Sequence, residues 1–164
     1  MKTALLVVDM QNEFFEDENS KKSLQDFLGV ANFSIDIFRN ANQPVIFIQD
    51  EDAGDGPGSY GYQLAEGLKA EDTDFYVSKQ YSNSFWQTNL EEKLNELNVG
   101  MVLICGFAAE YCVQATYQGA LERGFEPALI QHGIASIEQK YVEFVQEIYR
   151  TTSIKVVQYM FNNK

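Results

Sequence analysis

The sequence predicts an α/β fold with a mostly parallel sheet between two layers of helices. Short apolar runs rich in Val, Ile and Leu alternate along the chain with longer segments whose apolar residues recur at helical spacing. Runs that are apolar at every position are typical of strands buried on both faces, which need helices above and below them. This alternation therefore indicates a three-layer α/β/α arrangement.

The individual elements are predicted from apolar spacing and from the residues that interrupt it. Residues 3–8 are apolar and stop at Asp9, and a second apolar run occupies residues 44–49. Between them a helix is expected over residues 20–41, because its apolar side chains form one stripe: Leu24, Phe27, Leu28, Ala31, Ile35 and Phe38. Further strands are expected near residues 74–78, 101–105, 127–131 and 154–158, and further helices near 88–97, 111–123 and 138–149. The glycine-rich segment between the second and third strands is expected to be irregular.

Composition limits the classes of function. A chain of 164 residues that is 45% hydrophobic is long enough for one domain, residues 1–164, with a sizeable core. No apolar run approaches the ~20 residues of a membrane span, and Asp9 cuts short the N-terminal run, which argues against a secretory signal. The formal charge of -12 disfavours nucleic acid and anionic membranes as partners. Two cysteines without disulfide or metal spacing suit a reducing cytoplasm.

Cys112 stands where a predicted strand gives way to a helix. The apolar run Met101–Cys105 ends at Gly106, and a helical stripe that begins at Val113 ends before Gly124. The free N–H groups and the dipole at a helix start favour a thiolate, which can attack a carbonyl carbon. Cys112 is therefore a candidate nucleophile. The alternative is that it is a small buried hydrophobic residue, as most free cysteines are.

Asp9 and Lys79 are candidate partners of Cys112. Each directly follows a predicted strand, and the carboxyl ends of parallel strands are where open α/β sheets bind ligands. Taken alone, Asp9 is also explained as a turn cap and Lys79 as a surface charge. Together, an acid, a lysine and a cysteine, each just beyond a different strand, form a constellation suited to nucleophilic catalysis.

Three stretches, Leu5–Phe14, Lys79–Phe85 and Gly106–Val113, occur here in an order that resembles the isochorismatase-like cysteine hydrolases. This family includes nicotinamidases, N-carbamoylsarcosine amidases and isochorismatases, and the resemblance extends over nearly the whole chain. It implies a Rossmann-like sheet with strand order 3-2-1-4-5-6 and a non-proline cis peptide bond at Phe107–Ala108. It also implies a homo-oligomer, either a dimer or a tetramer.

The same resemblance implies a catalytic triad of Asp9, Lys79 and Cys112. Asp9 takes the thiol proton, Cys112 attacks a carbonyl or equivalent carbon, and Lys79 orients Asp9. The backbone N–H groups of Ala108 and Cys112 form the expected oxyanion hole. The expected activity is hydrolysis of a small amide, carbamoyl compound or enol ether through a covalent thiol intermediate, with no cofactor.

The loop after the second strand departs from the nicotinamidase branch of the family. That branch holds a metal there with an aspartate and histidines, whereas residues 50–58 contain no histidine and Ala65 stands where relatives often have one. The loop acids are oxygen ligands that suit a cation such as calcium, but their spacing fits no loop template, and a solvated acidic turn is the preferred interpretation: Asp50, Glu51, Asp52 and Asp55. No metal site is therefore expected, and a nicotinamidase with an atypical acidic metal site is the alternative. For the single histidine, His132, a structural role is expected rather than that of a base.

Aromatic residues beside these positions are candidates for lining a substrate pocket. Substrate contacts are predicted for Phe14, Tyr81, Phe85 and Tyr111, and Trp86 is assigned to neither pocket nor core. Gln11 is predicted to hydrogen-bond the substrate, or else to brace its loop. A mostly aromatic lining suits a small planar or vinylic substrate. A non-catalytic oligomeric scaffold of the same fold is a further alternative, against which the intact set of Asp9, Lys79 and Cys112 counts.

Overall fold

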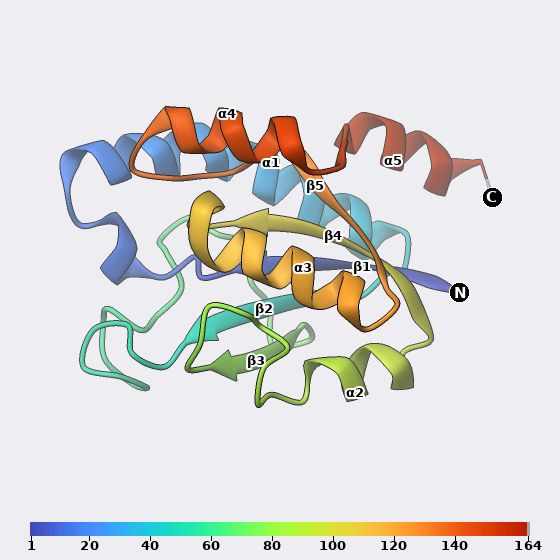
Figure 1. The fold of residues 1–164 in the computed structure, drawn as a ribbon, viewed down its shortest axis with the longest axis horizontal. Coiled ribbons are helices and arrows are strands. Elements are labelled where there is room, and N and C mark those ends of the chain that lie inside the picture. Colours follow the sequence, from blue (N-terminus) through green and yellow to red (C-terminus); the bar gives the residue numbers. More distant parts are fainter. Residues whose placement is uncertain (164) are drawn as a thin grey trace.

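The computed structural model describes residues 1–163, which form a six-stranded sheet flanked by helices (Figure 1). The strands lie in the order β3-β2-β1-β4-β5-β6 and every adjacent pair is parallel. Both the three-layer α/β/α class and the strand order 3-2-1-4-5-6 are confirmed. The strands are β1 (Lys2–Val8), β2 (Val45–Asp50), β3 (Phe75–Lys79), β4 (Val99–Gly106), β5 (Glu126–Ile134) and β6 (Thr151–Thr152).

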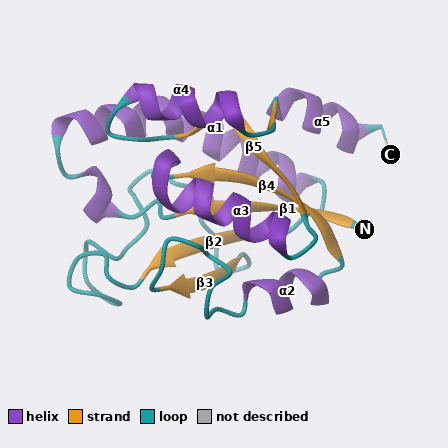
Figure 2. Cartoon of the chain, in the orientation of Figure 1, coloured by secondary structure: helices purple, strands orange, loops and turns teal. Residues whose placement is uncertain are grey.

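The helices cover the two faces of the sheet (Figure 2). One face is covered by α1 (Glu18–Asn40) and α5 (Ile154–Asn162). The other is covered by α2 (Leu90–Glu96), α3 (Gln114–Glu122) and α4 (Gln139–Ile148). Two short turns, the 3-10 helix η1 (Asn12–Phe15) and the π-helix η2 (Ala109–Val113), follow β1 and β4. Within residues 1–163, no helix has the length and apolar character needed to cross a membrane.

The apolar runs of β1 and β4 are explained by their central position. Residues 4–8 are fully buried because side chains that alternate along β1 pack into two separate clusters. Leu6 and Val8 lie in the cluster beneath α2, α3 and α4, whereas Leu5 and Val7 lie in the cluster beneath α1 and α5. Each face of the sheet thus has its own core, and residues 4–8 of β1 and 102–106 of β4 are buried between the two.

The sixth strand was predicted in the wrong place. Residues 154–158 begin helix α5, and β6 is the two-residue segment just before it. In this short apolar segment the helical spacing of Ile154, Val157 and Phe161 outweighs the β-propensity of its branched residues. Ile154 and Val157 are buried, and Phe161 packs edge-on against Phe38 of α1 with ring centroids 5.3 Å apart.

Candidate active site

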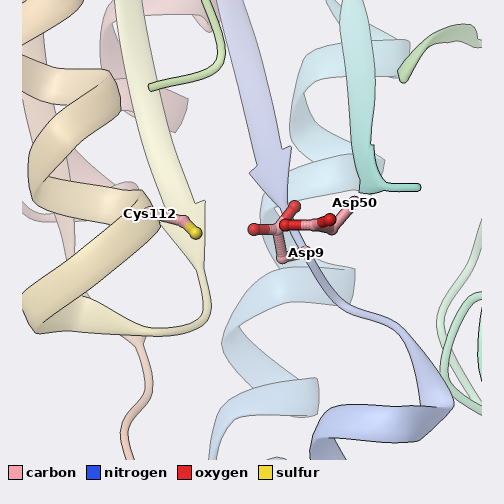
Figure 3. Close-up of side chains that lie close together, drawn as sticks. All are labelled: Asp9, Asp50 and Cys112. Carbon is pink, nitrogen blue, oxygen red and sulfur yellow. The ribbon is translucent and has the colours of Figure 1, made fainter. Parts of the chain in front are cut away.

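Two carboxylates, one ammonium group and one thiol meet at the carboxyl edge of the sheet. Asp9 follows β1 with a left-handed backbone (φ 50°), and Asp50 and Lys79 end β2 and β3 as register partners. Cys112 lies in η2, the turn after β4. Figure 3 shows Asp9, Asp50 and Cys112 converging from these separate elements. The structure therefore brings together the three residues singled out from the sequence and adds Asp50 to them.

The ammonium group of Lys79 lies at the centre of this cluster. Its Nζ is 2.7 Å from Asp9, 2.9 Å from Asp50 and 3.5 Å from Sγ of Cys112. Burial of the side chain lowers the pKa of Lys79, but the charges of Asp9 and Cys112 raise it, and the net shift is upward. Lys79 is thus a permanent buried cation that is held between two carboxylates.

Asp9 has the environment of a base. Burial raises the pKa of Asp9 to about 6, although Lys79 and the Cys112 thiol act in the opposite direction. Its contact with Lys79 is an ion pair, and within the described residues neither carboxylate oxygen accepts a well-directed hydrogen bond. A carboxylate with available lone pairs and a pKa near neutrality suits proton abstraction.

The expected thiolate of Cys112 is not supported by its surroundings. Burial raises the pKa of Cys112 to about 12; the nearby Asp9 adds to this rise and Lys79 only partly opposes it. The turn η2 runs directly into α3 at Gln114, so Cys112 lies near the start of one continuous helical segment but close to the Asp9 carboxylate. Burial and this carboxylate therefore favour the thiol form of Cys112 over the thiolate expected from the helix start.

The backbone after β4 sets the position of the turn that contains Cys112. Gly106 has a φ of 132°, and a Cβ there would lie 2.1 Å from the carbonyl oxygen of Val8, so only glycine fits. The Phe107 amide donates to that same oxygen at 2.9 Å, and the Phe107–Ala108 peptide bond is cis, as expected. The N–H of Ala108, a predicted oxyanion-hole donor, has no acceptor among residues 1–163. It is free to donate to a ligand beside Cys112.

Comparisons with known proteins show the family of this chain. The family model described as the isochorismatase domain matches residues 3–158. The chain belongs to the isochorismatase family. A curated relative, the isochorismatase family protein YddQ of Bacillus subtilis, is 30% identical over 156 residues, which cover 87% of this chain and 84% of YddQ.

Solved structures share the isochorismatase-like fold. The N-carbamoylsarcosine amidase of Thermoplasma acidophilum superposes with a TM-score of 0.81 at 24% identity, over 94% of this chain and 97% of that one. The pyrazinamidase of Pyrococcus horikoshii, solved in complex with zinc, gives a TM-score of 0.79 at 24% identity, over 93% and 99% of the two chains. The chain is thus a member of the isochorismatase-like hydrolases in sequence as well as in fold.

Asp50 was missed as a site residue of this isochorismatase-like chain. The sequence analysis placed it in the acidic loop, whereas it ends β2 and bonds Lys79. The signal was available, because Asp50 and Lys79 occupy equivalent positions at the ends of two neighbouring strands. Gln11 fixes Asp50: its side-chain amide donates to the carbonyls of Asp50 and Tyr62, each at 3.0 Å, and accepts from the Asp50 amide at 2.7 Å.

Two predicted substrate contacts therefore need correction. Gln11 is fully buried and both of its amide hydrogens are used, so it braces the loop and has no donor left for a substrate. Phe85 is 3% exposed and stacks on Phe125 in the core, with ring centroids 5.8 Å apart. Its position was misread because a ring that follows Lys79 in sequence turns inward beneath α2 and α3 instead of toward the site.

The remaining aromatic candidates lie at accessible positions. Phe14 is half-buried and stacks on Phe107. Tyr81, Trp86 and Tyr111 are all exposed. Tyr81 and Trp86 line a cavity of about 210 Å³ together with Lys79 and the carboxylate of Glu51. Of these rings, Tyr81 and Trp86 thus lie at a cavity that Lys79 also borders.

A divalent metal does not fit the residues present. Within the part of the chain that is described, one group of metal-ligating residues comes together: Asp9, Asp50 and Cys112, with ligand atoms within 4.8 Å of one another. The ammonium of Lys79 already contacts all three, so a metal would have to displace a buried cation. The other loop acids join no such group. His132 is exposed, with a left-handed backbone, and borders a separate cavity between α1 and α4.

Proposed function

We propose that this isochorismatase-like hydrolase cleaves the C–N bond of a small amide or carbamoyl compound by covalent catalysis, with Cys112 as nucleophile, Asp9 as base and Lys79 as the orienting cation. The observation that supports this most directly is the placement of the Lys79 ammonium within 3.5 Å of both partners. One buried cation holds the base and the thiol in a single geometry. The names of two structural neighbours, an N-carbamoylsarcosine amidase and a pyrazinamidase, point to the same bond type.

The reaction begins with the thiol form of Cys112. As Sγ forms a bond to the carbonyl carbon, the thiol proton passes to Asp9, whose pKa of about 6 leaves it mostly ionised at neutral pH. The carbonyl oxygen gains negative charge and is stabilised by the N–H groups of Ala108 and Cys112; one such donor is worth roughly 3 kcal/mol in known enzymes. The C–N bond then breaks and Asp9 gives its proton to the leaving nitrogen.

The second half of the reaction regenerates the enzyme. Asp9, again a carboxylate, takes a proton from water as that water attacks the thioester on Cys112. The C–S bond breaks, and the sulfur recovers a proton from Asp9. Throughout both steps Lys79 remains paired with Asp50, so the charge on Asp9 changes beside a cation that stays in place.

The loops that follow the first four strands form the rim of the site, and their negative charge favours a neutral or cationic substrate. Loop residues 9–17, 50–62, 79–89 and 106–113, which follow the first four strands, contain one basic residue, Lys79, and it is buried and already paired. The same loops carry many acids: Asp9, Glu13, Glu16, Asp17, Asp50, Glu51, Asp52, Asp55 and Glu110. A dicarboxylate enol ether such as isochorismate would meet repulsion there and no free cation. An amide or carbamoyl substrate is therefore preferred over an enol ether.

The test is ammonia release from a panel of small primary amides and carbamoyl compounds. Cys112→Ala should abolish turnover, because it removes the proposed nucleophile. Cys105→Ala is the matched control, since Cys105 is fully buried in the core and should affect stability alone. Intact-mass measurement of the wild type during turnover should show the acyl adduct on the peptide that contains Cys112. Turnover by Cys112→Ala at the wild-type rate would disprove the proposal.

A further inference from the structure

The loop after β3 is docked on the helical segment that contains Cys112. Ser84 of this loop and Thr116 of α3 are both fully buried, and their hydroxyl oxygens lie 2.6 Å apart. The backbone N–H of Ser84 also donates to the Thr116 hydroxyl, at 3.2 Å. One threonine side chain therefore bonds both the main chain and the side chain of Ser84. We refer to this contact as the Ser84–Thr116 pair.

A glycine of α3 allows a second close contact with the same loop. Gly119 lies in the middle of the helix, where glycine is less favourable than alanine. A Cβ at this position would lie 2.3 Å from Oδ1 of Asn83, so a larger residue would have to displace that side chain. Asn83 is held in place, because the same Oδ1 accepts the N–H of Phe85 at 2.9 Å. The helix thus has a glycine where the loop needs space.

The loop contacts lie along one side of the helical segment. Cys112, Thr116 and Gly119 follow one another at intervals of four and three residues, the spacing of neighbours on one helical face. Their contacts from β3 and its loop are, in the same order, Lys79, Ser84 and Asn83. The contact between the Lys79 ammonium and the Cys112 thiol is therefore the first of three along one face.

Strand pairing gives Lys79 and Cys112 no direct connection. They follow β3 and β4, which do not pair because β2 and β1 lie between them. The register of β3 holds Lys79 beside Asp50, and the loop after β3 then reaches across to α3. From this arrangement we infer that Ser84 and Thr116 are positioning residues, which hold the Cys112 thiol at the Lys79 ammonium. The inference rests on the proposed function, in which Cys112 is the nucleophile.

The test is acylation by p-nitrophenyl acetate, an activated ester whose leaving group needs no protonation. Sγ of Cys112 bonds the acetyl carbon, Asp9 takes the thiol proton and p-nitrophenolate leaves. The amplitude of the p-nitrophenolate burst counts competent sites and its rate measures their alignment, so a loss of folded protein lowers the amplitude alone. Thr116→Val, which keeps the shape of the side chain but not the hydroxyl, should slow the burst roughly 10- to 100-fold at wild-type amplitude.

Three further variants separate the hydroxyl contact from a general effect on folding. Thr116→Ser keeps the hydroxyl and should react at close to the wild-type rate. Ser84→Ala should slow the burst as Thr116→Val does, and the double variant should be no slower than either, because both changes remove one contact. Ser34→Ala is the matched control and should keep the wild-type rate. Ser34 is as buried as Ser84, but its hydroxyl donates to the Val30 carbonyl within α1, at 2.7 Å.

Gly119→Ala tests the close approach of the loop without changing the hydroxyl pair. Alanine favours a helix more than glycine does, yet its Cβ should displace Asn83 and slow the burst. Adding Asn83→Ser should restore the rate, because serine is shorter and its hydroxyl can still accept the N–H of Phe85. A slow burst in Gly119→Ala that Asn83→Ser does not relieve would argue against the loop contact as the cause.

Crystal structures give a readout that needs no reaction. The distance between Nζ of Lys79 and Sγ of Cys112 should lengthen from 3.5 Å by about 1 Å in Thr116→Val. A wild-type burst rate with an unchanged distance in this variant would overturn the inference. If Cys112→Ala instead gave a full burst, the proposed function would fail, and a lengthened distance in Thr116→Val would still support the positioning role.

Discussion

Asp50 and Lys79 are register partners at the ends of β2 and β3, and their charged groups meet 2.9 Å apart. The pairing of two neighbouring strands therefore fixes the cation that in turn contacts Asp9 and Cys112. The two carboxylates that hold Lys79 differ in their exposure to solvent. Asp9 is buried, whereas Asp50 is partly exposed.

This unequal placement predicts different effects of the two carboxylates. Asp9→Asn should lower kcat by about 10²–10⁴-fold, because it removes the base. Asp50→Asn should lower kcat by about tenfold, or about 1.4 kcal/mol, because Lys79 keeps Asp9 but loses its second anchor. Steady-state kinetics on a substrate found in the amide panel measures both. Glu96→Gln, at an exposed position of α2, is the control and should stay close to wild-type kcat. Equal losses in Asp50→Asn and Asp9→Asn would contradict the separate roles.

The raised pKa of Asp9 predicts an acid limb in the pH profile. Asp9 works as a base only when ionised, so kcat/KM should fall tenfold for each pH unit below about 6 and level off above it. Measurement of kcat/KM from pH 4.5 to pH 8 gives the position of this limb. A profile that is flat down to pH 4.5 would mean that a group other than Asp9 takes the thiol proton.

The raised pKa of Cys112 predicts slow alkylation. At pH 7.5 a thiol with a pKa of about 12 has far less thiolate than an ordinary cysteine, and its greater intrinsic nucleophilicity recovers only part of the loss. Iodoacetamide should therefore modify Cys112 about 100-fold more slowly than free cysteine, as followed by peptide mass mapping. Cys105, which is fully buried, is the internal control and should react more slowly still. Fast modification of Cys112 at pH 6 would restore the resting thiolate expected from the helix start.

The close approach of Gly106 to β1 predicts that Gly106→Ala destabilises the fold much more than Gly124→Ala does. Gly106→Ala should destabilise the fold by about 3 kcal/mol or more and abolish activity, since its Cβ collides with the Val8 carbonyl oxygen. Gly124 also has a left-handed backbone (φ 79°), but a Cβ there meets nothing within 4 Å. Gly124→Ala should cost only about 1–2 kcal/mol, the penalty of the left-handed conformation alone. Urea denaturation compares the two, and similar losses would show that the close approach to β1 is unimportant.

The acidic rim predicts a preference by substrate charge. Among amides of equal size, one with a cationic tail should have a higher kcat/KM than one with a carboxylate tail, by about tenfold or more at low ionic strength. The preference should shrink as salt is added, because exposed charges are screened beyond about 10 Å at 0.1 M salt. Glu51→Gln should reduce the preference, whereas Lys93→Gln, on α2, should leave it unchanged. A carboxylate substrate preferred at every salt concentration would contradict the role of the rim.

Much of the fold could be predicted because the relevant signals are local. Residues 4–8 are apolar at every position and residues 20–41 carry a long helical stripe, so each could be assigned from its own sequence alone. The segment 154–158 could not be assigned in this way, because a short apolar run fits both a strand and a helix until its packing partners are known. Phe161 of the same helix packs against the ring of Phe38, which lies more than a hundred residues away in sequence.

The residues of the candidate site could be predicted from the sequence, but the protonation state of Cys112 could not. Asp9, Lys79 and Cys112 could be found as strand-end residues and by family resemblance. The protonation of Cys112 depends on burial and on the distance to Asp9, which are properties of the assembled structure. Phe85 was misjudged, and the choice between the two roles of Gln11 stayed open, for a similar reason: proximity in sequence to the site does not say whether a side chain points into it.

The hydrogen bond from Phe107 to the carbonyl of Val8 ties the strand that precedes Asp9, the proposed base, to the turn that holds Cys112, the proposed nucleophile. The main chain thus sets the spacing of these two segments, and the Lys79 side chain sets the positions of Asp9 and Cys112 within it. Tyr81, Trp86 and Tyr111, in contrast, project from exposed positions and brace nothing at the centre. Substitution of these rim residues should therefore change which molecules are admitted and leave the pairing of Asp9, Lys79 and Cys112 in place.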